Sequence, residues 1–138
     1  MLKALLKVLY SRLRPIEAAK KAGAHINGQV SVTGAVDFGS EPWLVTVEDG
    51  VLLTQHVTFL THDGCVSTIR KLDPQYANLQ KFGKIHIKDN VCLGAYSYIM
   101  PNITIGKNSI VGACSVVIDD VPDNTVVAGI PAKAICST

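Results

Sequence analysis

The sequence predicts an all-β solenoid whose coils are built from six-residue repeats. Six consecutive hexapeptides span residues 87–122, and each of them begins with Ile, Leu or Val. The fifth position of every hexapeptide holds Val, Ser or Ile. A period of six preserves strand alternation, whereas the 3.6-residue period of an α-helix would move the apolar position around the axis. An unbroken short period of this kind indicates a solenoid in which successive coils stack on one another.

The N-terminal residues 1–23 are expected to form a helical cap over the open end of the solenoid. Residues 1–14 combine leucines at helical spacing with interspersed basic residues, and residues 16–23 predict a second short helix that stops at Gly23. The apolar stretch is too short and too interrupted to span a bilayer. The alternative to the cap is a basic amphipathic helix that rests residues 1–14 on an anionic membrane surface.

The repeat is expected to cover residues 24–62 and 85–122. Three hexapeptides would close one triangular coil of about eighteen residues, with the first-position aliphatic side chains stacked inside. Glycine follows three of these aliphatic residues, and without a Cβ it tolerates a corner or a close backbone approach. Asparagine at the fourth position tolerates turn geometry. These glycines and asparagines are Gly94, Gly106, Gly112, Asn90, Asn102 and Asn108.

One non-repetitive stretch, residues 63–84, interrupts the repeat and is expected to leave the solenoid as an extruded loop. Residues 123–138 are expected to form a C-terminal tail, and the 138 residues are expected to make a single domain. A hydrophobic content of 48% with only 6% aromatic residues fits a core of stacked aliphatic side chains. A net charge of +2 gives no reason to expect nucleic acid as a partner.

The cysteine pattern argues against a metal or disulfide framework. The four cysteines are widely spaced and include no C-x-x-C pair, so we expect no metal site. Reduced thiols in a cytosolic protein are the better interpretation, and the expected location is the cytoplasm. The cysteines are Cys65, Cys92, Cys114 and Cys136.

Two segments near the C-terminus resemble the hexapeptide-repeat acyltransferases. They are IGKNSIVGACSVV and the overlapping SVVIDDVPDNTVVAGIPAKAI, which runs from Ser115 to Ile135. The resemblance covers residues 24–135 and implies a left-handed parallel β-helix, a homotrimer and acetyl-CoA as the cosubstrate. The hand of the helix is implied by the resemblance and not by the period. The stretch VTFLTHDG, residues 57–64, resembles the active-site segment of the branch that acetylates sugars, small xenobiotics and serine.

His62 is the expected general base. It occupies the last repeat position before the break, where the resembling branch carries its histidine. An acceptor hydroxyl is a poor nucleophile while it keeps its proton, and neutral imidazole is available near neutral pH to remove that proton. His86 is the rival candidate, and His56 is expected at the adjacent corner of the triangle. A covalent acyl-cysteine at Cys65 is the less favoured alternative.

The resemblance also implies where the two substrates bind. The loop over residues 63–84 is expected to reach a neighbouring subunit and to wall the acceptor pocket. The pantetheine arm of the cofactor is expected in a groove between two subunits. The residues expected to contact the acceptor are Asp63, Arg70 and Tyr76. Those expected to contact acetyl-CoA are Ala95, Ala113, Ile118 and Lys133.

The expected function is that of an acetyl-CoA-dependent O-acetyltransferase acting on a sugar or a polysaccharide precursor, with bacterial surface polysaccharide synthesis as its setting. Two alternatives stay open. One is N-acetylation of an amino sugar or transfer to serine, because hydroxyl and amine acceptors can both use a histidine base. The other is a non-catalytic β-helix or a carbonic-anhydrase-like protein, which would need three zinc-binding histidines across a trimer interface.

Overall fold

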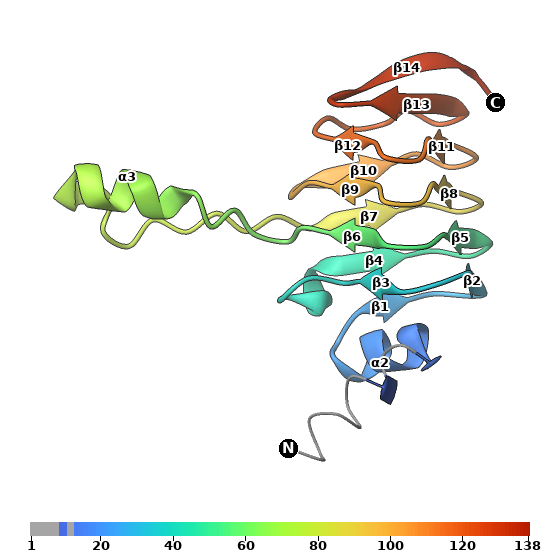
Figure 1. Cartoon of the computed structure of the whole chain (residues 1–138), viewed down its shortest axis with the longest axis horizontal. Coiled ribbons are helices and arrows are strands. Elements are labelled where there is room, and N and C mark those ends of the chain that lie inside the picture. Colours follow the sequence, from blue (N-terminus) through green and yellow to red (C-terminus); the bar gives the residue numbers. More distant parts are fainter. Residues whose placement is uncertain (1–8, 11–12) are drawn as a thin grey trace.

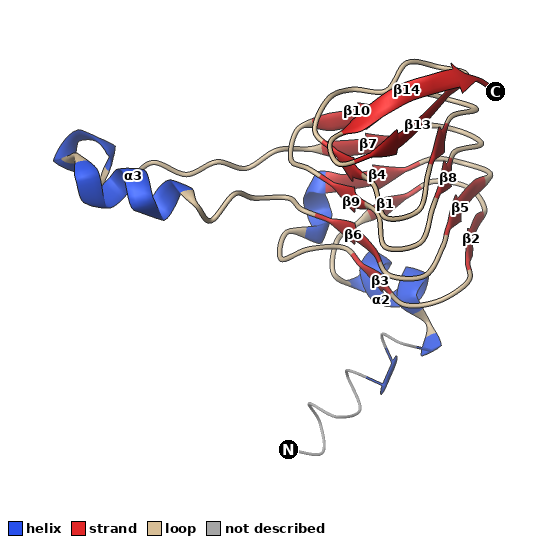
Figure 2. Ribbon diagram, turned by 45° about the horizontal axis from the view of Figure 1, so that its top comes forward, coloured by secondary structure: helices blue, strands red, loops and turns tan. Residues whose placement is uncertain are grey.

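The computed structural model of the chain describes residues 9–10 and 13–138. It confirms the expected fold class, a left-handed parallel β-helix with a short helix at its N-terminal end and one long extruded loop (Figure 1). Most strands are only two or three residues long, and they stack into three sheets. An oblique view shows the coils winding around a common core (Figure 2).

Along most of the chain, successive strands belong to the first, second and third sheet in turn. The first sheet contains β1 (His25–Ile26), β4 (Val45–Val47), β7 (Ile85–Ile87) and β10 (Ile103–Ile105). The second contains β2 (Val30–Val32), β5 (Val51–Leu53), β8 (Cys92–Leu93), β11 (Ile110–Val111), β13 (Thr125–Gly129) and β14 (Ala132–Ser137). The third contains β3 (Val36–Asp37), β6 (Val57–Phe59), β9 (Tyr98–Ile99) and β12 (Val116–Val117). We call the turns from first to second, second to third and third to first sheet the first, second and third corners.

The spacing between stacked residues differs between the early and late coils. Ile85 pairs with Ile103, a separation of 18 residues that corresponds to three hexapeptides. Val36 pairs with Val57, a separation of 21 residues. The three additional residues form a single turn of 3₁₀ helix over Pro42–Leu44 at the third corner. The first coil therefore carries an insertion at that corner.

The core consists of columns of inward-facing apolar side chains. The first-position residues of the hexapeptides stack coil upon coil and exclude water, as the period predicts. Each fully buried Val, Leu or Ile contributes about 1.5–3 kcal/mol relative to an exposed side chain. Three columns contain Val47, Ile87 and Ile105; Leu53, Leu93 and Val111; and Phe59, Ile99 and Val117.

The corners use glycine and asparagine for different reasons. Asn90 and Asn108 have positive φ angles, 55° and 58°, and their side chains form a ladder in which Asn90 Nδ2 donates to Asn108 Oδ1 at 3.0 Å. Gly94 instead permits a close approach, because a Cβ there would lie 2.5 Å from the backbone nitrogen of Ala113 in the next coil. Both residue types therefore allow the coils to stack at the spacing the core requires.

The N-terminal end of the core is covered by helix α2 (Pro15–Lys21). Ala19 is buried against the first coils and Ile16 packs beside it, so the helix forms the expected cap. The amphipathic helix expected over residues 1–14 lies largely outside the described residues. Within the part of the chain that the structure describes, no helix has the length and apolarity needed to cross a bilayer.

The expectation of a C-terminal tail over residues 123–138 is wrong. Strand β13 continues the second sheet in parallel beside β11, and β14 turns back to pair with β13 in the antiparallel sense. The last coil would otherwise present unpaired backbone groups along its upper edge. The hairpin pairs with that edge, and Val127 of β13 extends the buried core by one more layer.

A buried hydroxyl without a partner yields a prediction about stability. Ser97 Oγ is fully buried and has no hydrogen-bond partner among the residues that the structure describes, whereas Ser109 Oγ donates to the Pro122 carbonyl at 2.7 Å. Because an unsatisfied buried hydroxyl costs about 1 kcal/mol or more, Ser97→Ala is expected to raise the free energy of unfolding by about 1 kcal/mol. Ser109→Ala is the matched control and is expected to lower it by a similar amount. Denaturant titration measures both, and an equal loss of stability in the two variants would contradict this reading of Ser97.

Candidate active site

His62 lies at the third corner, where the chain leaves the β-helix after β6. Its Nδ1 atom is 2.8 Å from Oε2 of Glu41, and the same oxygen accepts a hydrogen bond from Thr61 Oγ1 at 2.7 Å. Glu41 precedes His62 by the 21 residues that separate stacked positions in the first coil, so it lies one coil below. Glu41 was not predicted from the sequence. The structure therefore adds a carboxylate partner to the expected base.

The environment of Glu41 determines which nitrogen of His62 carries a proton. The hydrogen bond from Thr61 is the main cause that lowers the pKa of the Glu41 carboxyl, and the bond and charge of His62 lower it further against the opposing effect of burial. An ionised carboxylate can only accept hydrogen bonds, so Nδ1 of neutral His62 donates to it. The lone pair of Nε2 is then available to take a proton from a ligand.

The outgoing and returning segments of the extruded loop are hydrogen-bonded to each other at the base of the loop, next to His62. Asp63 N donates to the Lys81 carbonyl, Gly83 N donates to the Thr61 carbonyl, and His62 pairs directly with Phe82. The rings of His62 and Phe82 meet edge to face with their centroids 6.0 Å apart. An open hollow of about 380 Å³ lies next to Phe82, and its lining residues are Glu41, Trp43, Leu44 and Phe82.

The other histidines lie elsewhere on the prism. His86 is on the outer face of β7, with Nε2 2.9 Å from Oε1 of Glu48, and Asn27 donates to the other carboxylate oxygen. These two bonds, the one from Asn27 first, lower the pKa of the Glu48 carboxyl. His56 lies at the second corner, where its ring stacks on Tyr96 with centroids 4.9 Å apart. His62 and His86 therefore each have their own carboxylate partner, but only the partner of His62, Glu41, lines the hollow.

The residues expected to contact the acceptor are spread along the extruded loop. Asp63 does not pair with His62; its Oδ1 accepts from Cys65 N and its Oδ2 is 3.8 Å from Lys81 Nζ. Arg70 belongs to helix α3 (Val66–Leu72) and donates from Nε to the Leu79 carbonyl.

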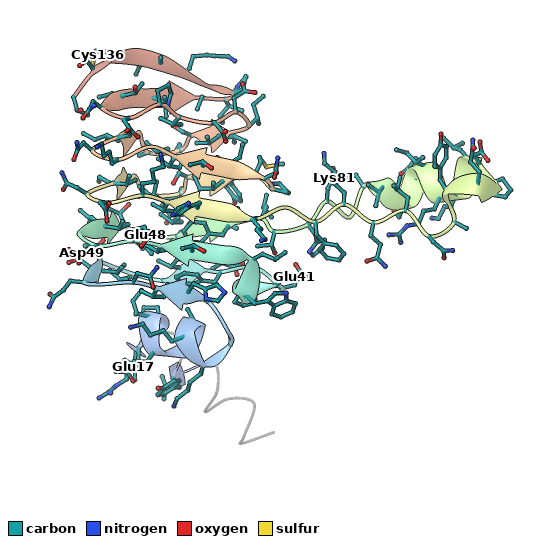
Figure 3. All side chains as sticks on the ribbon, turned by 180° about the vertical axis from the view of Figure 1, so that it is seen from behind. Glu17, Glu41, Glu48, Asp49, Lys81 and Cys136 are labelled. Atoms are coloured by element: carbon teal, nitrogen blue, oxygen red, sulfur yellow. The ribbon has the colours of Figure 1, made fainter. Side chains whose placement is uncertain are left out.

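Tyr76 belongs to the 3₁₀ helix over Pro74–Tyr76 and is 42% exposed. Figures 1 and 2 show that α3 lies at the far end of the extruded loop, away from the β-helix, and Figure 3 shows Glu41 on the body and Lys81 out along the loop. Within one chain, the structure does not bring Arg70 or Tyr76 to His62.

The residues expected to contact acetyl-CoA lie on the last coils. Ala95 and Ala113 stack at the second corner, where Cys114 N donates to the Ala95 carbonyl at 2.8 Å. Ile118 follows β12 at the third corner and is 47% exposed, and Lys133 Nζ is 3.5 Å from Asp119 Oδ2 on the surface. Since His62 and the two alanines occupy different corners, a single chain does not gather them around one site.

The structure also bears on metal binding and on the chemistry of the cysteines. Across residues 9–10 and 13–138, no group of three or more His, Cys, Asp or Glu side chains could hold a metal ion. All four cysteines are free, and burial raises the pKa of the Cys92 thiol. Cys65 is exposed at the start of α3, and its backbone nitrogen donates a hydrogen bond to Oδ1 of Asp63.

Comparison with known proteins identifies several that resemble this chain. Residues 84–119 match a family model described as bacterial transferase hexapeptide (six repeats). Protein CapG of Staphylococcus aureus is 41% identical over 100 residues, which are 72% of this chain and 56% of that protein. A galactoside O-acetyltransferase of Escherichia coli is 36% identical over 100 residues, which are 69% of this chain and 45% of that protein. The chain thus spans about half the length of these curated relatives.

A solved structure agrees with the fold over almost the whole chain. The hexapeptide-repeat acetyltransferase from Vibrio cholerae superimposes with a TM-score of 0.72. The matched region covers 97% of this chain and 87% of the Vibrio cholerae chain. Its sequence identity is 22%, so this likeness concerns the fold alone.

The role of Thr61 leads to a prediction about the titration of Glu41. Thr61→Val replaces the donating hydroxyl with a methyl group of similar size, so the pKa of the Glu41 carboxyl is expected to rise because its main stabilising hydrogen bond is lost. Carboxyl ¹³C NMR across a pH titration measures the change. Glu48 is the internal control, since its partners are Asn27 and His86 and its midpoint should not move. An unchanged Glu41 midpoint in Thr61→Val would contradict the assignment of this hydrogen bond.

Proposed function

The chain belongs to the hexapeptide-repeat acyltransferase family, and on that premise we propose that it transfers the acetyl group of acetyl-CoA to a hydroxyl of a sugar or polysaccharide precursor. The observation that carries this proposal is the pair formed by Glu41 and His62 at the base of the extruded loop. The relative named galactoside O-acetyltransferase supports a sugar hydroxyl as the acceptor. The proposed setting is bacterial surface polysaccharide synthesis in the cytoplasm, the compartment expected for a chain with free thiols.

The proposed mechanism uses both partners of this pair. Nε2 of His62 takes the proton of the acceptor hydroxyl while its oxygen attacks the thioester carbon of acetyl-CoA. Glu41 holds the Nδ1 proton, keeps the ring in one orientation and stabilises the imidazolium that forms. The imidazolium then returns the proton to the departing thiolate of CoA. No covalent acyl-enzyme is required, so Cys65 has no role in this scheme.

The distribution of residues over the corners supports a site shared by two copies of the chain. His62 at the third corner and Ala95 and Ala113 at the second corner flank the third sheet from its two sides. A threefold arrangement with the third sheets near the axis would bring the third corner of one copy to the second corner of the next. The extruded loop, with Arg70 and Tyr76, would then reach a neighbouring copy. The proposed assembly is therefore a homotrimer with acetyl-CoA between two subunits.

Replacement of the proposed base tests the mechanism directly. His62→Ala is expected to lower kcat by at least a hundredfold, within the range of about 10² to 10⁴ that a positioned general base supplies. The assay follows thiol release from acetyl-CoA with a panel of nucleotide sugars, free sugars, amino sugars and serine. His86→Ala is the control and is expected to keep most of the activity, since His86 lies away from the hollow. Near-full transfer by His62→Ala together with an inactive His86→Ala would reverse the assignment.

The proposed assembly has its own test. Light scattering on the purified protein is expected to give three times the chain mass of 14.7 kDa. The same mass is expected for His62→Ala, because the imidazole is 42% exposed at a corner and is not part of the buried core cluster. A monomer mass at the concentration of the activity assay would contradict a site shared between subunits.

A further inference from the structure

The hollow beside His62 is framed by two large aromatic side chains that are open to solvent. Trp43 is 55% exposed and Phe82 is 52% exposed, and both line the hollow together with Leu44 and Glu41. Only 6% of the sequence is aromatic, and Trp43 is its single tryptophan. Two such rings beside a carboxylate–imidazole pair form an apolar surface with one polar edge.

Both aromatic residues lie on hydrogen-bonded backbone. Trp43 is in the middle of the three-residue 3₁₀ insertion at the third corner, where its Cβ lies 3.3 Å from the position that a Cβ on Gly23 would occupy. Phe82 is the direct antiparallel partner of His62, and directly paired residues project to the same face of a β-ladder. The apolar surface therefore lies on the same side as the imidazole of His62.

The polar edge of the hollow is the carboxylate of Glu41. The bonds from Thr61 and His62 both end on Oε2, so neither of them occupies Oε1. The pKa of this carboxyl is lowered, which keeps Oε1 a strong acceptor for a ligand hydroxyl at neutral pH. The hollow thus offers aromatic rings and a charged acceptor at a short distance from the proposed base.

We infer that the hollow binds the pyranose ring of the acceptor, with its C–H face on Trp43 and Phe82 and one of its hydroxyls donating to Oε1 of Glu41. A pyranose combines an apolar C–H face with a rim of hydroxyls, and both parts have a complementary group here. Serine has no ring face to cover these aromatic side chains. The inference rests on the proposed function for the role of His62, and it narrows the acceptor to a pyranoside.

The first test separates binding of the acceptor from binding of acetyl-CoA. Trp43→Ala and Phe82→Ala are each expected to raise KM for methyl pyranosides about tenfold, since an aromatic contact is worth about that factor, with KM for acetyl-CoA within twofold of its original value. Trp43→Phe is expected to recover most of the loss. Ile135→Ala is the matched control, because Ile135 is an exposed apolar side chain on β14 at the opposite end of the molecule.

The second test measures binding of a pyranoside in the absence of catalysis. Because Trp43 is the single tryptophan, its fluorescence reports on the hollow alone. Titration with a methyl pyranoside is expected to change the emission saturably in the unsubstituted protein and in His62→Ala, whereas L-serine is expected to leave it unchanged. A saturable change without acetyl transfer to any acceptor would support the pyranose site and refute the proposed reaction.

Two results would overturn the inference while leaving the proposed reaction in place. One is acetyl transfer to sugars with the KM for pyranosides unchanged in both alanine variants and no change in Trp43 emission. The other is a loss of trimer mass in Trp43→Ala, which would show that a second copy of the chain covers the hollow.

Discussion

Each coil of this β-helix has to bury its inward side chains on the equivalent side chains of the coil below. That constraint repeats every 18 residues in the later coils, as in the pairing of Ile85 with Ile103. Because the cores stack in columns, the corners also stack in columns, and a side chain at a corner acquires neighbours that are far away in sequence. The contact between His62 and Glu41 arises in this way, since the two residues occupy the same corner in successive coils.

The six-residue period was sufficient to predict the core, the corners and the break at residue 62. Glu41 and Trp43 were not predicted, because their positions depend on an insertion in the first coil. A signal was present: the valines of the first coil are out of phase with later ones by three residues, and a 21-residue spacing counted back from His62 gives residue 41. The C-terminal hairpin was missed because residues 125–137 leave the period and β14 runs antiparallel, which no repeat implies.

Pairing with a carboxylate does not by itself distinguish a catalytic histidine in this molecule. His62 and His86 each have such a partner at a similar distance. They differ in position: His86 lies on the outer face of a regular strand, whereas His62 lies beside an open hollow where the chain leaves the helix. Ala95 and Ala113, two of the residues expected to bind acetyl-CoA, lie at the second corner, so a site that joins them to His62 requires a second copy of the chain. In the proposed assembly, the long loop, with α3 at its far end (Figure 1), would carry Arg70 and Tyr76 to a neighbouring copy of the chain.

The most direct test of this account is a crystal structure of the protein with CoA bound. The account predicts that CoA lies in a crevice between two subunits, with its sulfur facing Nε2 of His62 from one and its pantetheine arm along Ala95 and Ala113 of the other. A CoA molecule whose sulfur faces His86 or His56, or one bound wholly within a single chain, would contradict the central claim.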